Sequence, residues 1–228
     1  MMRFPKRKAR PLDEGGSVSP LAGVMCIALV FATAFAVDLG AQMLMAERQN
    51  SMMQVARETV EQAGNGFEVK NSGNGMQELS RQVCQSLKDQ GFQGWAYCVS
   101  AEPQAGYAPT AGPNSGKTLR SDRRVIGCTV VMSETRPSVF AKLLGQDELA
   151  VHSSTTFTVM PYSSGTAWRD GQGPYADKAA YLPESGDVTT SPGSGAGIAD
   201  KLAACGTSQS DIGDKALQAA RDRTDAYE

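Results

Sequence analysis

The chain has 228 residues, of which 41% are hydrophobic and 20% are charged, and its formal net charge is −2. This length allows one or two domains. The near-neutral charge argues against a nucleic-acid partner, because phosphates are bound by a basic surface. Basic charge is concentrated at the start of the chain, in Arg3, Lys6, Arg7, Lys8 and Arg10.

An uncharged, apolar run from Val18 to Val37 follows this basic cluster. About 20 apolar residues in a helix are needed to cross ~30 Å of hydrocarbon, so the run predicts a membrane-spanning helix. Basic residues favour the cytoplasmic side of a membrane. We therefore expect a single-pass membrane protein, with residues 1–17 as a cytoplasmic basic tail and everything after Asp38 outside the cytoplasm.

The helical pattern continues beyond the apolar run to Ala63, and Gly64-Asn65-Gly66 is the first firm stop. A transmembrane and extended helix over residues 18–63 would be about 65–70 Å long. Its outer half has apolar residues at helical spacing, namely Leu39, Met43, Ala46, Met53, Ala56 and Val60. Two interpretations of this face are open: it packs on its own domain, or it packs against copies of itself or a related subunit.

Residues 64–160 predict an extracytoplasmic α+β domain. The expected elements are a helix over Gly75–Gln90, strands over Phe92–Ser100, Arg124–Ser133 and Val151–Met160, and a short helix over Pro137–Leu144. Together they predict a small antiparallel sheet with helices on one face. Residues 161–228 are rich in Gly, Ser and Pro and predict a largely disordered C-terminal region, in which Asp211–Ala226 has the pattern of a short amphipathic helix.

Four cysteines, Cys84, Cys98, Cys128 and Cys205, would lie outside the cytoplasm. An even number of extracytoplasmic cysteines predicts two disulfides. Three pairings are allowed, and the sequence alone does not choose among them. We favour Cys98–Cys128, because both residues lie in predicted strands, and this leaves Cys84–Cys205.

The residues around the apolar run form a recognisable pattern. Gly16-Ser17-Val18 opens the run, Val37-Asp38-Leu39-Gly40 ends it, and a helix rich in Gln, Met and Ala continues through Gln42–Asn50. This pattern resembles the TadE/TadG group of pilin-like proteins from the tight-adherence (Flp-type) pilus systems of bacteria. The resemblance covers about residues 15–63.

The resemblance implies a pilin-like fold and a structural role in the bacterial cell membrane, as a minor pilin or as a membrane-anchored assembly partner. Its partners would be the bilayer and other pilin-like subunits or pilus assembly platform proteins. The possible processing site lies between Gly16 and Ser17, and Asp38 and Gly40 mark the exit from the membrane. Asp38 is then either an ordinary polar residue of the interface or a pairing site within an assembly.

One position departs from the pattern of the cleaved pilins, which have a glutamate five residues after the processing glycine. Here that position is Leu21, and no acidic residue occurs between Ser17 and Val37. In a fibre, this glutamate can pair with the new N-terminal amine of a neighbour, so that two opposite charges are buried together. The departure favours an uncleaved, membrane-resident TadG-like protein.

A signal peptide is the alternative to a membrane anchor. Ala34-Phe35-Ala36 is an A-x-A cleavage pattern behind a basic segment and an apolar stretch, and cleavage after Ala36 would release a secreted or otherwise anchored extracytoplasmic binding protein. The uninterrupted helical pattern across this site favours the anchor, in which small residues serve helix packing.

The sequence predicts no enzyme. Residues Ala111–Thr118 fit a relaxed phosphate-binding loop, but a proline-containing loop precedes them and a predicted strand follows, so we expect no nucleotide. His152 is the single histidine, and no Cys-x-x-Cys occurs, which disfavours a metal site. We expect no catalytic residue, no metal and no cofactor.

Overall fold

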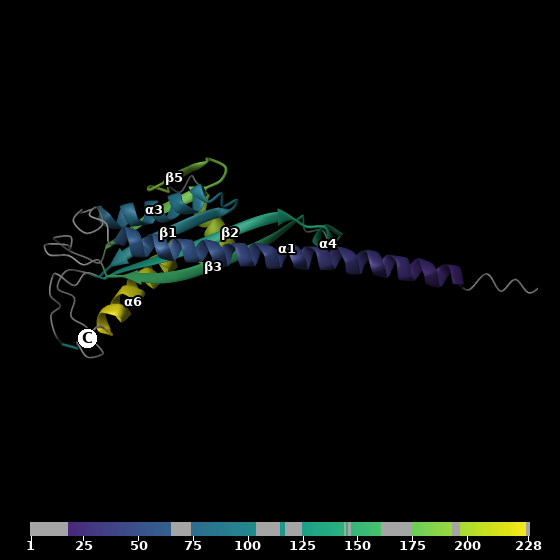
Figure 1. The fold of residues 1–228 in the computed structure, drawn as a ribbon, viewed down its shortest axis with the longest axis horizontal. Helices are drawn as coiled ribbons and strands as arrows, with labels where there is room; N and C mark the ends of the chain where they lie inside the picture. Colours follow the sequence, from purple (N-terminus) through teal and green to yellow (C-terminus); the bar gives the residue numbers. More distant parts are fainter. Residues whose placement is uncertain are drawn as a thin grey trace, which may run out of the picture.

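A computed structural model describes residues 18–64, 74–103, 115–116, 125–143, 145, 147–160, 175–192 and 197–226. One long helix, α1 (Val18–Gly64), lies along an α+β head with its second half and runs out beyond it with its first half (Figure 1). The other helices are α3 (Gly75–Asp89), α4 (Phe140–Leu143), α5 (Ile198–Ala204) and α6 (Gln209–Asp225). The strands are β1 (Trp95–Glu102), β2 (Ile126–Pro137), β3 (Glu148–Val159), β4 (Tyr175–Leu182) and β5 (Asp187–Thr189).

The five strands form one antiparallel sheet in the order β3-β2-β1-β4-β5. The hairpin of β2 and β3 is longer than its neighbours: it is paired from Ile126↔Val159 to Pro137↔Glu148, whereas β1 accompanies β2 only as far as Ser133. The far end of this hairpin therefore projects from the sheet. It runs beside α1 and carries α4 at its end (Figure 1).

Helices cover both faces of the sheet. One core lies between the sheet and helices α1 and α3, and it includes Met52, Ala56, Val60, Leu79 and Leu87. A second core lies on the other face, where Ile198, Leu202 and Ile212 of α5 and α6 pack on β1, β2 and β4. The expectation of helices on one face is therefore wrong, because the C-terminal segment supplies a second helical layer.

The C-terminal region is ordered over much of its length. Its described residues form β4, β5, α5 and α6, which corrects the expectation of a largely disordered segment after residue 160. Its apolar content is low because its packing residues are small: Ala179, Ala180, Ala216 and Ala220 are all fully buried. The helix expected over Asp211–Ala226 is present as α6, whose capping box joins Ser208 and Asp211.

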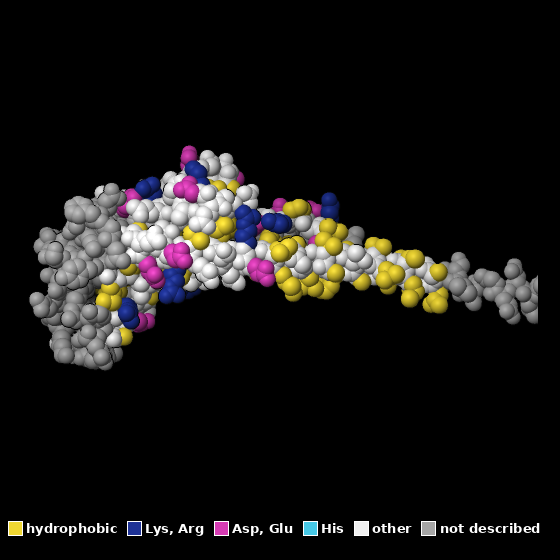
Figure 2. Space-filling view, in the orientation of Figure 1, with side chains coloured by type: hydrophobic (Ala, Val, Ile, Leu, Met, Phe, Trp, Pro, Cys, Tyr) yellow, Lys and Arg dark blue, Asp and Glu magenta, His cyan; other side chains and the backbone are white. Residues whose placement is uncertain are grey.

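The two halves of α1 have opposite surfaces. By length and composition α1 is a candidate membrane span, and the side chains of its apolar run are mostly exposed, from Leu21 at 64% to Val37 at 53%. Figure 2 shows these side chains as a hydrophobic stretch that leads away from the mixed surface of the head. In the outer half, the buried face consists of Asp38, Met45, Gln49, Met52, Ala56 and Val60.

This buried face differs in part from the predicted one. Ala56 and Val60 are buried as expected, and Met53 packs against the same core, but Leu39 and Met43 are exposed by 36% and 62%. The buried face includes the polar residues Asp38 and Gln49, whose hydrogen bonds to the head decide which side of the helix turns inward. A hydrophobicity pattern does not record such polar contacts.

We predict that Gly127→Ala destabilises the head by about 1–3 kcal/mol, the usual cost of overpacking. A Cβ atom at Gly127 of β2 would collide with the backbone carbonyl of Ala216 in α6. The matched control is Gly213→Ala in α6, where a Cβ meets no atom within 4 Å and helix propensity should stabilise by up to about 1 kcal/mol. Denaturant unfolding of the detergent-solubilised protein measures both. Equal stabilities of Gly127→Ala and the parent would contradict the docking of α6 on β2.

Candidate functional site

The site that joins the apolar half of α1 to the head is centred on Asp38. Asp38 contacts the end of the β2–β3 hairpin. We call this part of the head the tip; it consists of Ser138, Val139 and helix α4. Oδ2 of Asp38 accepts hydrogen bonds from Oγ of Ser138 at 2.5 Å and from N of Phe140 at 2.6 Å. Oδ1 accepts one from N of Val139 at 2.9 Å. The Asp38 carboxylate therefore satisfies amide groups at the start of α4 that have no partner within the helix.

Local sequence explains why the chain turns here. Pro137 ends β2, and N of Ser138 donates to O of Asp147 at 3.0 Å, which closes the base of the tip. Gly145 has φ +82°, a backbone conformation that glycine adopts without steric cost, and its N donates to O of Lys142 at 3.2 Å. These residues confine α4 to about one turn.

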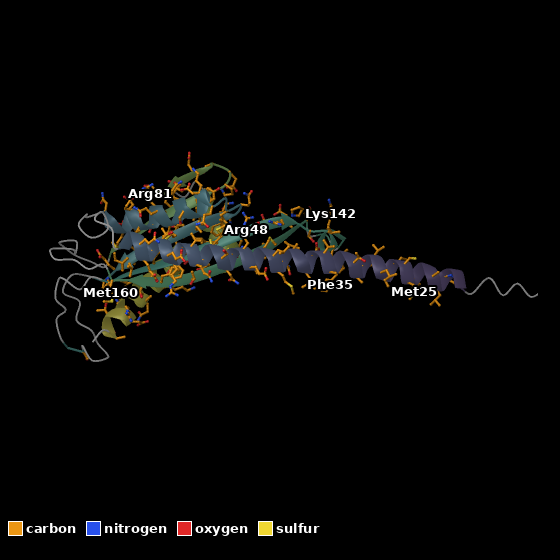
Figure 3. The ribbon with its side chains drawn as sticks, viewed as in Figure 1. Met25, Phe35, Arg48, Arg81, Lys142 and Met160 are labelled. Carbon is orange, nitrogen blue, oxygen red and sulfur yellow. The ribbon has the colours of Figure 1, made fainter. Side chains whose placement is uncertain are left out.

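Aromatic side chains continue the contact toward the N-terminal half of α1. The ring of Phe140 packs edge-on against Phe31, with centroids 6.2 Å apart, and against Phe35, with centroids 5.5 Å apart. Beside them is an open apolar groove of about 420 Å³ between α1 and the tip, lined by Leu29, Val30, Thr33, Ala34, Val37 and Val139. Figure 3 shows Phe35 and Lys142 near this junction, far from the Arg81 end of the head.

Two polar residues of α1 extend the attachment along the hairpin. Gln49 is fully buried; its Nε2 donates to O of Val151 at 2.8 Å, and its Oε1 accepts from Oγ of Ser153. Arg48 donates from Nη2 to O of Gly91 at 2.6 Å and forms an ion pair with Glu134 at 3.7 Å. Glu134 is 2% exposed, so charge-assisted contacts are required to offset its burial.

A second apolar groove lies just above the junction, between α1 and the edge strand β3. Its volume is about 430 Å³, and it is lined by Leu39, Gln42, Met43, Ala46, Ala150, Val151 and His152. A Cβ placed on the neighbouring Gly40 would meet no atom within 4 Å, so Gly40 leaves open space beside the helix. The groove thus exposes apolar side chains of α1 beside the edge strand.

Three of the cysteines lie together in the core between the sheet and α3. Cys84, Cys98 and Cys128 are all fully buried, and Sγ of Cys98 is 3.2 Å from Sγ of Cys128. None of the five cysteines is bonded in the structure, but this contact is compatible with the favoured Cys98–Cys128 pairing. Burial raises the pKa of the Cys84 thiol and of the Cys98 thiol, so both are protonated at neutral pH.

The Cys84–Cys205 pairing is wrong in this fold. Cys84 belongs to the core on the α1 and α3 side of the sheet, whereas Cys205 packs against the core on the α5 and α6 side. Sγ of Cys205 lies 3.2 Å from Nδ1 of His152, which also contacts Oγ of Ser133 at 2.8 Å. Burial raises the pKa of the Cys205 thiol, which opposes a nucleophilic role.

Some predicted features fall outside the described residues. Gly16 and Ser17 do, and of Ala111–Thr118 only Ser115 and Gly116 are described, so neither processing nor phosphate binding is placed by the geometry. Among the residues that the structure does describe, no group of three or more His, Cys, Asp or Glu side chains is arranged to hold a metal ion.

The contact of Asp38 with the tip was not foreseen from the sequence, which placed Asp38 at the membrane boundary as an ordinary interfacial residue or as a pairing site within an assembly. Its carboxylate has hydrogen-bond donors within its own chain, about a hundred residues away. No family model, no curated protein and no solved structure matches the chain.

We predict that Asp38→Ala loosens the tip, because the amides of Val139 and Phe140 lose their acceptor. Each lost bond to a charged group is worth about 1.5–3 kcal/mol, so hydrogen exchange at these two amides should accelerate by at least about tenfold. Exchange measured in detergent micelles tests this, with Glu47→Ala on the exposed side of α1 as the control. Unchanged protection of residues 139–140 in Asp38→Ala would contradict the assigned role.

We predict that alkylation of the unfolded, unreduced protein labels Cys26, Cys84 and Cys205, and that Cys98 and Cys128 are labelled only after reduction. The reason is that Sγ of Cys98 and Sγ of Cys128 are in contact, whereas the sheet separates Cys84 from Cys205. Peptide mass spectrometry identifies the labelled residues. Labelling of all five without reduction would exclude the disulfide, and labelling of Cys26 alone would contradict the separation of Cys84 from Cys205.

Proposed function

We propose that the protein is a single-pass, pilin-like structural component of a Tad-type pilus or secretion assembly, as a minor pilin or a membrane-anchored assembly partner. The observation that carries the proposal is the continuity of α1. One helix has an exposed apolar first half and a second half that forms part of the core of the head. Such a helix holds a folded extracytoplasmic domain at a set distance from the bilayer.

The groove between α1 and β3 supports a role in assembly. Leu39, Met43 and Leu44 lie just beyond the membrane boundary and are exposed by 36%, 62% and 64%. Apolar helix positions that leave the bilayer and yet find no cover in their own domain favour packing against another subunit. Two interpretations of this face were open. Ala56 and Val60 are buried in the core of the head, and we assign the exposed Leu39 and Met43 to contact with a partner.

The anchored form is favoured over a cleaved fibre subunit. The apolar run has no carboxylate to pair with the amine of a processed neighbour, and Leu21 is an exposed apolar residue. The first carboxylate after Ser17, Asp38, accepts three hydrogen bonds from the tip. We assign the N-terminus to the cytoplasm and the head to the outside, with a structural role that involves no catalysis, cofactor, nucleotide or nucleic acid.

The second candidate is a secreted or anchored binding protein, released by cleavage after Ala36. Cleavage there would remove Phe31 and Phe35, which are both ring partners of Phe140. It would leave Asp38 as the second residue of the mature chain, on a frayed helix end. The tip would lose its aromatic contacts with α1, and its hydrogen-bond acceptor, Asp38, would lie on an unstable helix end. The intact contacts therefore favour the uncleaved membrane anchor.

The mature N-terminus, determined by mass spectrometry of separated membrane and medium fractions, tests the proposal. A start at Met1 or Met2 in the membrane supports the anchored component. A start at Ser17 would move the assignment to a processed fibre subunit. A start at Val37 in the medium would overturn the membrane role.

We predict that Met43→Glu reduces co-purification with pilin-like subunits or platform proteins of the assembly. A charge buried in an apolar helix contact without a partner should weaken binding by at least about tenfold, or about 1.4 kcal/mol. The control Gln54→Glu adds the same charge at an exposed position of the same helix. Equal recovery of partners with Met43→Glu and the parent would show that this groove is not the assembly surface.

A further inference from the structure

We propose that the tip is a second membrane contact: it enters the outer leaflet beside α1, with Val139 and Phe140 at the edge of the hydrocarbon and Lys142 among the lipid headgroups. The occupant of this surface is the bilayer itself. The inference rests on α1 spanning the membrane, as proposed above, but not on any role in a pilus.

The depth of the tip follows from its contacts with α1. The apolar run ends at Val37, next to Asp38, which marks the membrane boundary. Phe35 and Phe31 lie about 5 Å and 10 Å deeper along the helix, at 1.5 Å per residue. The ring of Phe140 packs against both. If α1 crosses the bilayer at this run, Phe140 must lie below the level of Asp38 and therefore within the outer leaflet.

The surface of the tip suits lipid. Val139 is 55% exposed, and together with the α1 residues it lines the open apolar groove of about 420 Å³. The other five lining residues of that groove belong to the predicted membrane span. The groove therefore opens toward hydrocarbon, and an acyl chain is the matching occupant. The sequence from Pro137 to Leu144 contains no acidic residue.

The amide and hydroxyl donors at the start of the tip all have hydrogen-bond acceptors, as they must in a site without water. A backbone amide that is left unpaired in hydrocarbon costs several kcal/mol. The amides of Val139 and Phe140 and the hydroxyl of Ser138 all donate to Asp38, and the amide of Ser138 donates to Asp147. In water, solvent molecules could accept these hydrogen bonds, and the donors would need no carboxylate. Their complete pairing is expected of a loop that is pushed into the membrane edge.

Lys142 sets the limit of insertion. Its side chain is exposed, and it lies on the side of α4 turned away from α1 (Figure 3). A lysine at the edge of a bilayer can extend its amine to the headgroups while its stem stays in the apolar layer. The tip thus combines apolar side chains that face the lipid with one basic residue whose amine can reach the headgroups.

A second membrane contact would fix the orientation of the head, which one helix cannot do. A single spanning helix leaves the head free to rotate about the helix axis. The tip contacts α1 on the Asp38 side, so insertion of the tip selects one rotation and one tilt. The groove formed by Leu39, Met43 and β3 is then presented at a constant height and direction above the membrane.

Brominated lipids, which quench nearby tryptophan, test this inference in the full chain. Val139→Trp is reconstituted at low protein density in vesicles with bromines placed on the acyl chains, and the signal of the parent is subtracted. Leu29→Trp, in the apolar run, is the control for a residue in lipid. Glu58→Trp, an exposed residue about 30 Å above Asp38 on the same helix, is the control for a residue in water. Lys142→Trp reports the depth of residue 142, which we expect among the lipid headgroups.

We expect Val139→Trp to lose fluorescence by at least about half as much as Leu29→Trp, because both side chains face hydrocarbon. Lys142→Trp should be quenched best by bromines close to the headgroups, and Glu58→Trp should not be quenched. Quenching of Leu29→Trp with none at Val139→Trp or Lys142→Trp would overturn the inference and leave the membrane span intact.

Two further results would also overturn it. If Leu29→Trp is not quenched, α1 does not span the bilayer, and the proposed membrane role fails together with the inference. If quenching of Val139→Trp falls as the protein density in the vesicles is raised, a second copy covers the tip in place of lipid.

Discussion

The fold depends on one buried carboxylate at the end of an apolar helix. Asp38 accepts three hydrogen bonds from the tip of the β2–β3 hairpin, which is the part of the sheet that has lost its other neighbour strand. A hairpin that projects alone is only marginally stable in water. The Asp38 contact, with the rings of Phe31, Phe35 and Phe140 below it and Gln49 above it, supports the projecting hairpin along α1. Helix α1 and the sheet therefore form one body.

This arrangement has a mechanical consequence. Met52, Ala56 and Val60 of α1 lie in the same core as α3 and the sheet, so the helix is a structural element of the head as well as its stalk. A tilt or shift of α1 would be transmitted directly to the sheet, since packed cores deform little. Together with a tip in the outer leaflet, the helix would present its exposed groove beside β3 in a constant orientation. A protein that assembles through helix contacts at the membrane benefits from such rigidity.

Several elements were predictable because they depend on local properties of the chain. The extent of α1, the helix over Gly75–Asp89, the three strands before residue 160 and the helix near the C-terminus all follow from periodicity, caps and breakers. Other features were missed because they depend on packing. Strand β4 is built around Ala179 and Ala180, small residues that give a weak strand signal. Ala179 packs in the core under α3, and Ala180 packs in the core that α5 and α6 cover. The second helical layer was missed for the same reason, because it packs through small residues such as Ala216, which lies against Gly127.

The sequence by itself determined that the chain has a long helix with an apolar half, an α+β head and two cysteines in strands, because each is a matter of composition or of spacing within a few residues. Only the tertiary structure decided which side of the helix faces the head, that the donors to Asp38 come from residues 138–140, and that the sheet separates Cys84 from Cys205. These outcomes depend on groups about a hundred residues apart in the chain, and polar pairing and sheet order, rather than hydrophobic periodicity, bring them together or keep them apart.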